Sequence, residues 1–268
     1  MYKVGFIGCG NMGSAIASAV AKTADPKEIL LADCESQKAE DLASALGART
    51  AGNEGVAREC AYIFLAVKPQ MMEEVLQPLA AVLKQREDHF VLVSMAAGLA
   101  ISDIARMSAG SFPIIRIMPN TPVAVNKGMT LACASPEVRE EDLDTFFRLM
   151  SESGRLDLIP EEWIDAAGAL SGCGPAYVYL FLEALADGAA ACGLPKEKAL
   201  EYACQTAIGA SSMVRETGRD PGELTEAVCS PGGTTIEGVH ALEQGKMQKT
   251  VMEAVKAAYD KTALLKKQ

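Results

Sequence analysis

Three glycines near the start of the chain have the spacing of a phosphate-binding turn. In GFIGCGNMGSAI, Gly8, Gly10 and Gly13 directly follow a β-rich run and open a helical pattern. The first glycine allows a tight turn, the second lets the backbone approach a pyrophosphate, and the third lets helix and strand pack closely. We therefore expect a dinucleotide site that includes Asn11 and Met12. The alternative is that the glycines only ease a tight strand-to-helix turn.

An acidic residue stands where such a turn requires a ribose contact. Asp33 follows Gly13 by about 20 positions, at the end of the second β-rich run. Its carboxylate could accept hydrogen bonds from the ribose hydroxyls of NAD, whereas the 2′-phosphate of NADP usually needs a cation or several donors. The following CESQK has no basic residue apart from Lys38. This loop gives no support to an NADP preference, and the sequence leaves NADH and NADPH both open.

Two proline-containing segments lie at strand ends, where the nicotinamide half of a dinucleotide should run. They are AVKPQ at residues 66–70 and MPNTP at residues 118–122. In both, proline stops helix formation after the strand and leaves backbone groups free for a ligand. Asn120 adds an amide that can donate and accept hydrogen bonds. The alternative is two proline-terminated strands, with Lys68 as a surface charge.

The stretch CSPGGTTIEG, residues 229–238, interrupts a helical region. Ser230 and the glycines that follow precede a helix expected to begin near Thr234. They would present unpaired backbone N–H groups at a positive helix end, which can bind a carboxylate without an arginine, and Thr235 offers a hydroxyl nearby. The residues fit equally well an interhelical turn with Thr234 as the N-cap.

Neither histidine is placed to assist reduction of a ketone, which needs a general acid near the reacting carbon. His89 precedes the fourth major strand, at the wrong end of the sheet, and His240 lies in the helix after CSPGGTTIEG. A cyclic imine differs because it can arrive protonated and already electrophilic. An enzyme that reduces it needs mainly orientation and a hydrogen-bond partner at nitrogen.

The elements that position these residues form two predicted domains, 1–159 and 160–268. In the first, β-rich runs alternate with helical patterns, and several runs are continuously apolar, as strands covered on both faces must be. This series predicts an α/β fold with a mostly parallel, doubly wound sheet whose ligands lie beyond the carboxyl ends of the strands. The expected strands are residues 2–7, 29–33, 62–66, 90–94, 114–118, 129–133 and 155–159.

Only helical spacing continues after Pro160. Many apolar positions there are Ala, Gly or Cys, so the domain has few large side chains to bury, and we expect a homodimer of interlocked helices. The alternative is a self-sufficient helical lobe, which a monomeric mass would favour. The expected helices are residues 162–170, 177–191, 195–215, 223–228, 236–243 and 246–266.

Composition and charge narrow the range of partners. The chain has 268 residues, 49% of them hydrophobic, and a formal net charge of −10, which suits one or two globular domains and argues against a nucleic-acid partner. No apolar run approaches the roughly 18 to 20 residues of a membrane span, so we expect a cytoplasmic protein without a membrane partner. The eight cysteines are scattered, with no Cys-x-x-Cys, and predict neither a metal site nor disulfides.

The ordered set of motifs resembles the pyrroline-5-carboxylate reductases. It covers nearly the whole chain, from GFIGCGNMG through AVKP, SMAAG, RIMPNTP and SGCGPAY to PGELTEAVCSPGGTTIEGVHALE. The resemblance implies a Rossmann-type domain followed by an all-α dimerisation domain, with dimers that form decamers in many members. It also implies hydride transfer from NADPH or NADH to the imine 1-pyrroline-5-carboxylate, which gives L-proline in the last step of proline synthesis.

The same resemblance implies roles for individual residues. Thr235 matches the residue near the ring nitrogen and is the expected catalytic residue. Cys173 stands where many relatives have serine, which removes a hydroxyl donor and leaves the role of that position open. Asn53 could still serve a 2′-phosphate, although DCESQK lacks the family's commoner phosphate-binding residues. The expected cofactor-side residues are Asn53, Ala66, Val67, Lys68, Pro69, Ala97 and Asn120, and the expected carboxylate loop is Ser230, Gly232, Gly233, Thr234 and Thr235.

Two other functions are compatible with parts of the sequence. A β-hydroxyacid dehydrogenase shares the layout but needs a catalytic lysine on an early helix of the second domain, and the segment from Gly174 to Ala191 contains none. A redox-sensing scaffold would bind the dinucleotide without turnover. Coenzyme consumption on addition of the imine distinguishes the three functions.

Overall fold

The computed structural model describes residues 2–265, which form two compact units. Contacts group the chain up to Cys173, together with the chain from Ala258 onward, into one unit, and Gly174–Ala257 into the other. The boundary expected after residue 159 marks the change from strands to helices along the sequence. The compact unit that contains the strands extends further, to Cys173, and includes helix α7, Ile164–Ser171. Residues 266–268 of the expected second domain lie outside the described part.

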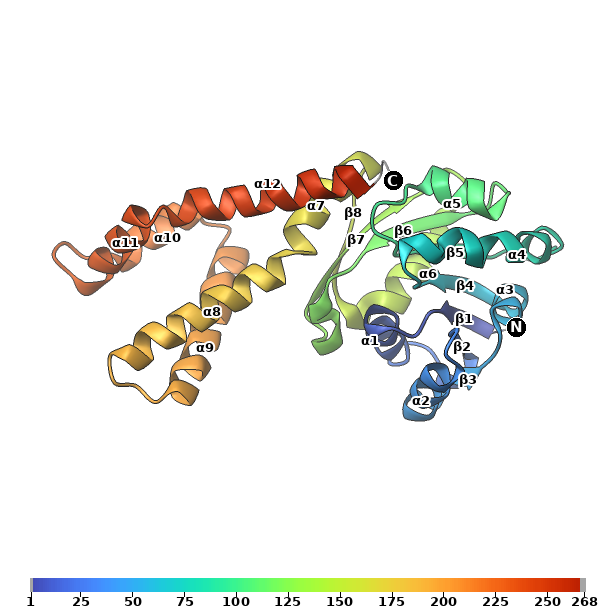
Figure 1. Cartoon of the computed structure of the whole chain (residues 1–268), viewed down its shortest axis with the longest axis horizontal. Coiled ribbons are helices and arrows are strands. Elements are labelled where there is room, and N and C mark those ends of the chain that lie inside the picture. Colours follow the sequence, from blue (N-terminus) through green and yellow to red (C-terminus); the bar gives the residue numbers. More distant parts are fainter. Residues whose placement is uncertain (1, 266–268) are drawn as a thin grey trace. The chain divides into compact units, whose positions relative to one another are not determined.

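The first unit contains an eight-stranded sheet in the order β3-β2-β1-β4-β5-β6-β7-β8 (Figure 1). Only the β6–β7 pair is antiparallel among the described pairs. Every strand expected from the sequence is present, and the edge strand β3 was not predicted because two residues carry no periodicity. The strands are β1 Tyr2–Ile7, β2 Ile29–Ala32, β3 Arg49–Thr50, β4 Cys60–Leu65, β5 Val91–Ser94, β6 Ile114–Met118, β7 Gly128–Ala134 and β8 Gly154–Leu158.

Successive strand residues point to opposite faces of the sheet, and most strand residues are apolar. Both faces therefore need a cover of helices. Phe6 and Phe64 stack with ring centroids 4.6 Å apart and belong to one buried cluster, while Ile63 and Leu65 belong to the other. The doubly wound α/β prediction is therefore confirmed. The first cluster contains residues of α1 Asn11–Val20, α2 Ser36–Leu46 and α6 Glu140–Met150, and the second contains residues of α3 Asn53–Glu59, α4 Met72–Lys84 and α5 Ile101–Ser108.

A buried arginine ties α7 to the sheet. The side chain of Arg116 on β6 is 2% exposed, and its guanidinium lies 3.0 Å from a carboxylate oxygen of Glu161 and 3.1 Å from one of Asp165. A buried charge is tolerated only when it is paired and hydrogen-bonded. These two acids lie just before and within α7, which gives a physical reason for this helix to group with the strands.

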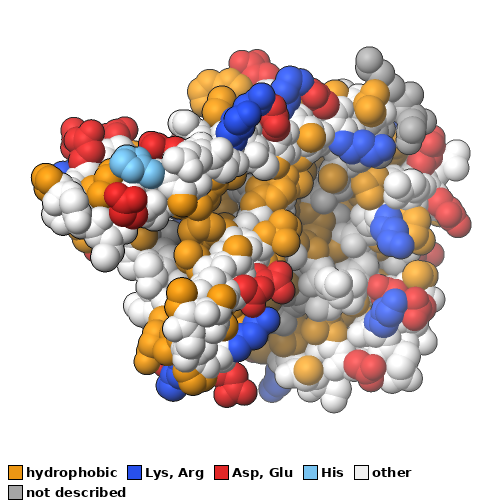
Figure 2. Space-filling view, turned by 60° about the vertical axis from the view of Figure 1, so that its left-hand side comes forward, with side chains coloured by type: hydrophobic (Ala, Val, Ile, Leu, Met, Phe, Trp, Pro, Cys, Tyr) orange, Lys and Arg blue, Asp and Glu red, His pale blue; other side chains and the backbone are white. Residues whose placement is uncertain are grey.

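The second unit is helical and has almost no core of its own. Its buried residues in the described chain are three alanines, Ala186, Ala199 and Ala203, whereas Leu180 is 66% exposed and Ile208 is 60% exposed. Apolar side chains cover much of the visible surface of these helices (Figure 2). The sequence predicted few large side chains to bury, whereas this unit has many large apolar side chains that lie exposed. The helices are α8 Gly174–Ala191, α9 Lys196–Thr217, α10 Pro221–Val228 and α11 Thr234–Gln244, followed by α12 Met247–Leu265, which continues past this unit.

One helical stretch is long and apolar enough, by length and composition alone, to cross a membrane. It runs from Glu161 to Ala191, and 11% of its most apolar window is buried within the chain. The sequence prediction that no stretch approaches such a length is wrong when length and mean hydropathy are the criteria. The two acidic residues of α8, Glu183 and Asp187, are surrounded by apolar residues, many of them alanine, so the helix stays apolar on average. A second protein surface would cover such side chains as well as lipid would.

Candidate dinucleotide and substrate sites

The glycine turn lies at the carboxyl end of β1, where the strand order reverses between β1 and β4. Gly8 has a φ of +105°, and a Cβ atom added there would lie 2.6 Å from the carbonyl oxygen of Ala66. A Cβ atom at Gly13 would lie 2.2 Å from the carbonyl oxygen of Gly8. Both positions therefore require glycine, one for the turn and one for close packing of α1. In open α/β sheets, ligands bind at this topological switch point.

The middle glycine of the turn faces open space. A Cβ atom at Gly10 would meet nothing within 4 Å, and Gly10 is the N-cap of α1 without a side chain to cap the first N–H groups. Gly10 and Asn11 are exposed, and Met12 is half-buried. Free N–H groups and the positive end of a helix attract an anion. These residues therefore fit the pyrophosphate of a dinucleotide.

Asp33 is held against this turn by hydrogen bonds. The backbone N–H of Cys9 donates to Asp33 Oδ2 at 2.6 Å, and the backbone N–H of Glu35 donates to Asp33 Oδ1 at 2.9 Å. Partial burial opposes ionisation of this carboxyl, but the two N–H donors and the Cys34 thiol outweigh it and hold the pKa of Asp33 below its ordinary value. The residue is therefore a fixed carboxylate at neutral pH.

Other predicted cofactor residues lie at the same edge of the sheet. The N–H of Ala66 donates to the carbonyl oxygen of Ile7 at 2.8 Å, which brings the AVKP segment beside the glycine turn. Lys68 is exposed there, and Ala97 is exposed in the loop that follows β5. Asn53 is half-buried and begins α3. Val67 and Pro69 are half-buried within the AVKP segment.

The side chain of Asn120 is engaged inside the protein. Its Nδ2 donates to the carbonyl oxygen of Ser171 at 2.9 Å, and its Oδ1 accepts from the N–H of Met129 at 2.8 Å. The side chain thus joins the end of β6 to α7 and β7, a structural role that the sequence did not indicate. A role of Asn120 toward the cofactor stays a prediction.

The loop before α11 is a turn that ends in a glycine at the start of the helix. Gly232 has a φ of +69°, and the N–H of Gly233 donates to the carbonyl oxygen of Ser230 at 3.0 Å. Gly233 is the N-cap, and Thr234 is the first helical residue, so the alternative with Thr234 as N-cap is wrong. Because glycine has no side chain, the first N–H groups of α11 receive no side-chain cap.

Thr235 lines a mostly apolar cavity of about 450 Å³ in the helical unit. A hydroxyl in an apolar wall can orient a small ring that has one hydrogen-bonding atom. The sequence did not single out the apolar lining, because these residues occupy ordinary core-like positions of helices. The other lining residues are Ala210, Met213, Val214, Pro221, Leu224, Thr225 and Val228.

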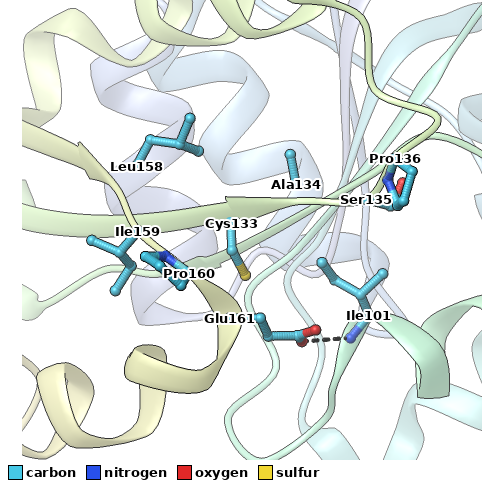
Figure 3. A pocket seen from close by; sticks show the side chains of 9 residues that line it. All are labelled: Ile101, Cys133, Ala134, Ser135, Pro136, Leu158, Ile159, Pro160 and Glu161. Carbon is cyan, nitrogen blue, oxygen red and sulfur yellow. Dashed lines mark hydrogen bonds between the residues drawn. The ribbon is translucent and has the colours of Figure 1, made fainter.

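A second cavity, of about 470 Å³, lies in the first unit and contains none of the predicted site residues. The carboxylate of Glu161 in its wall accepts a hydrogen bond from the N–H of Ile101 at 2.8 Å (Figure 3) and also pairs with Arg116. Burial, with a further contribution from the charge of Glu161, raises the pKa of the Cys133 thiol in the same wall to about 11. These groups serve the fold and leave no reactive group in the cavity wall.

The remaining ionisable candidates do not form a metal or acid–base centre. His89, in the segment before β5, has its Nε2 within 2.9 Å of Asp142 Oδ1, and His240 is exposed on α11. Among residues 2–265, no group of three His, Cys, Asp or Glu side chains could hold a metal ion. Cys173 is exposed, and nothing in the structure gives it a role.

The chain is similar to known proteins along nearly its whole length. Residues 161–265 match the family model for pyrroline-5-carboxylate reductase dimerisation, and residues 3–98 match the model for NADP oxidoreductase, coenzyme F420-dependent. The pyrroline-5-carboxylate reductase of Glycine max is 40% identical over 96% of this chain and 93% of its own length. That of Escherichia coli is 38% identical over 99% of this chain and 98% of its own length.

Solved structures extend the likeness to the fold. The pyrroline-5-carboxylate reductase of Coxiella burnetii superposes with a TM-score of 0.90 at 31% identity, covering 100% of this chain and 99% of that one. The pyrroline carboxylate reductase of Plasmodium falciparum, solved with NADP bound, gives a TM-score of 0.86 at 32% identity, covering 99% of this chain and 98% of that one. The chain therefore belongs to the pyrroline-5-carboxylate reductase family.

Proposed function

We propose that the chain reduces 1-pyrroline-5-carboxylate to L-proline with NADPH or NADH as the hydride donor. The observation that carries this proposal is an identity of 40% and 38%, over nearly the full length of the chain, with reductases of that name in a plant and a bacterium. The local geometry supports it in two places. The turn from Gly8 to Gly13 suits a pyrophosphate, and the loop before α11 suits a carboxylate.

Each half of the proposed site has a defined task. We assign the pyrophosphate to the backbone of the glycine turn and the ribose to Asp33. We assign the substrate carboxylate to the N–H groups of Gly232, Thr234 and Thr235 at the uncapped start of α11, where the N–H of Gly233 already donates to Ser230. The other cofactor contacts are proposed for Asn53, Ala66, Val67, Lys68, Pro69, Ala97 and Asn120, and Ser230 completes the carboxylate loop.

The proposed chemistry needs orientation more than proton transfer. When bound, the reduced nicotinamide supplies a hydride to the imine carbon. The Thr235 hydroxyl forms a hydrogen bond with the ring nitrogen, which receives the electron pair of the C=N bond and keeps the proton with which it arrived. This role explains why a general-acid histidine near the loop is not needed.

We also propose that the enzyme is a cytoplasmic homodimer, and that dimers assemble into decamers. The exposed apolar residues of the helical unit and the match to a dimerisation model support self-association. A second copy of the chain, rather than lipid, would then cover the apolar stretch from Glu161 to Ala191. Light scattering gives the mass of the assembly, and recovery of the protein in the membrane fraction after lysis would contradict this assignment.

Turnover and one substitution test the proposed reaction. Addition of the imine should oxidise NADH or NADPH and form an equal amount of proline. Thr235→Ala should lower kcat/KM by at least about tenfold, or roughly 1.4 kcal/mol of transition-state stabilisation. If kcat/KM of Thr235→Ala stays within about threefold of wild type, the Thr235 hydroxyl has no role in the reaction.

A matched control separates this effect from threonine loss in general. Thr250 is exposed on α12, and its hydroxyl donates at 3.1 Å to the carbonyl oxygen of Lys246, the residue just before that helix. Thr250→Ala should leave kcat/KM unchanged. Thr235→Ser, which keeps the hydroxyl, should recover most of the activity that Thr235→Ala loses.

A further inference from the structure

The ribose end of the predicted dinucleotide site is negatively charged and rigid. Asp33 follows β2 directly, and its two carboxylate oxygens accept the N–H groups of Cys9 and Glu35 at 2.6 and 2.9 Å. Cys9 belongs to the glycine turn, so the carboxylate is fixed one hydrogen bond away from the expected pyrophosphate site. Such a carboxylate cannot swing away to admit a larger group without breaking both hydrogen bonds.

The neighbouring cation, Lys38, offsets this charge only in part, because a second acid also pairs with it. Lys38 Nζ lies 2.6 Å from Glu35 Oε1, and the ion pair is exposed. The ammonium of Lys38, in the first turn of α2, is therefore already paired with the N-cap residue of that helix. Asp33, Glu35 and Lys38 together leave one net negative charge where the adenosine ribose is expected.

The two coenzymes differ only at this ribose. A ribose with free hydroxyls donates hydrogen bonds to a carboxylate, whereas a 2′-phosphate has no such donor and brings a second negative charge. Sites that accept the phosphate usually place an arginine there. We propose that Asp33 makes this enzyme prefer NADH to NADPH, with the Glu35–Lys38 pair as the second determinant. The NADP found in the Plasmodium falciparum relative shows that the family fold alone does not decide this choice.

This inference extends the proposed function, and binding of ribose fragments tests it without turnover. In calorimetric titrations, ADP-ribose should bind at least about tenfold more tightly than ADP-ribose 2′-phosphate. In steady-state assays, kcat/KM with NADH should exceed that with NADPH by a similar factor of about ten. Equal affinities, or tighter binding of the phosphorylated fragment, would overturn the inference. Failure of both coenzymes to reduce the imine would instead contradict the proposed function and leave the binding result valid.

Two variants identify the residues responsible. Asp33→Asn removes the charge at nearly constant size and should bring the ratio of the two fragment affinities close to one. Glu35→Gln leaves Asp33 intact but releases Lys38 from its ion pair, and it should strengthen binding of the phosphorylated fragment alone. Because Glu35 is exposed, this second variant tests the inference even if Asp33→Asn fails to fold.

A charge-matched control excludes a general electrostatic effect. Glu87 is exposed in the segment before β5, at the amino end of that strand, whereas ligands bind beyond the carboxyl ends. Glu87→Gln changes the net charge as much as Glu35→Gln does. It should leave the affinity ratio unchanged, and an equal shift in both variants would refute the role of the Glu35–Lys38 pair.

Discussion

Gly10→Ala should separate cofactor binding from folding. The backbone at Gly10 has φ −70° and ψ −175°, which alanine adopts without strain, and the added Cβ atom meets nothing within 4 Å. Alanine at a compatible glycine position stabilises a protein by about 0.4 to 1 kcal/mol through the unfolded state. The same methyl group would occupy the space through which a pyrophosphate must approach the backbone. We therefore expect unchanged or slightly higher stability together with weaker coenzyme binding.

The magnitude can be read from thermal unfolding with and without coenzyme. At a coenzyme concentration of about 100 times Kd, ligand binding stabilises the folded protein by about 2.7 kcal/mol. A tenfold weaker Kd at the same concentration reduces this to about 1.4 kcal/mol. A Gly10→Ala variant that keeps the full ligand-induced shift in Tm would show that the pyrophosphate does not bind at this turn.

Gly13→Ala provides the contrast. Its Cβ atom would lie 2.2 Å from the carbonyl oxygen of Gly8, so the turn itself must move. We expect a loss of about 1 to 3 kcal/mol of stability even without coenzyme, as overpacked sites show. If Gly13→Ala were as stable as Gly10→Ala, close packing of α1 on β1 would not be the reason for this glycine.

Three further substitutions test the fold and the assembly. Arg116→Ala should lower the free energy of unfolding, measured by urea denaturation, by about 3 kcal/mol or more, because Glu161 and Asp165 lose their buried partner. The control Arg106→Ala removes a side chain that is 61% exposed and should change this free energy by less than about 0.5 kcal/mol. Burial of Asp142 opposes its ionisation, but Arg139 and His89 outweigh this effect and lower its pKa. The ionised carboxylate therefore stabilises the fold above about pH 4, and this stabilisation is lost as pH falls through the folded-state pKa. The difference in urea midpoint between wild type and Asp142→Asn should shrink on acidification. Leu180→Glu should reduce the mass measured by light scattering to that of one chain, and Val125→Glu, at a 68% exposed position in the first unit, should leave the mass unchanged.

The sheet could be predicted from the sequence because its strands are buried on both faces. Short continuous apolar runs such as that at 62–66, repeated between helical patterns, are typical of strands that helices cover on each side of a parallel sheet. The two-residue strand β3 escaped prediction because pairing with β2, not sequence pattern, defines it. The grouping of α7 with the strands also depends on a tertiary contact, the ion pairs of Arg116, which spacing along the chain cannot reveal.

The candidate site could be predicted only where backbone geometry demands a residue type. Gly8 and Gly13 are specified by a positive φ and by a close approach, so their spacing is visible in the sequence. The start of α11 has no side-chain cap because its N-cap residue is Gly233 and not Thr234. Helix patterns in a sequence do not resolve a difference of one residue at a helix end. The engagement of Asn120 with Ser171 and Met129 joins residues that are distant in the chain, so it needed the structure.

The helical unit links assembly to the proposed catalysis. Fully burying a leucine-sized side chain contributes about 1.5 to 3 kcal/mol, whereas the fully buried side chains of this unit are three alanines, a small contribution against the conformational entropy of its ordered helices. Its stability must therefore come largely from surface covered by another copy of the chain. Thr235 and the proposed carboxylate loop lie in this same unit, so dissociation of the proposed dimer should also disorder the proposed substrate site. Specific activity should then fall on dilution at the concentration where the mass falls, and a fully active monomer would contradict this coupling.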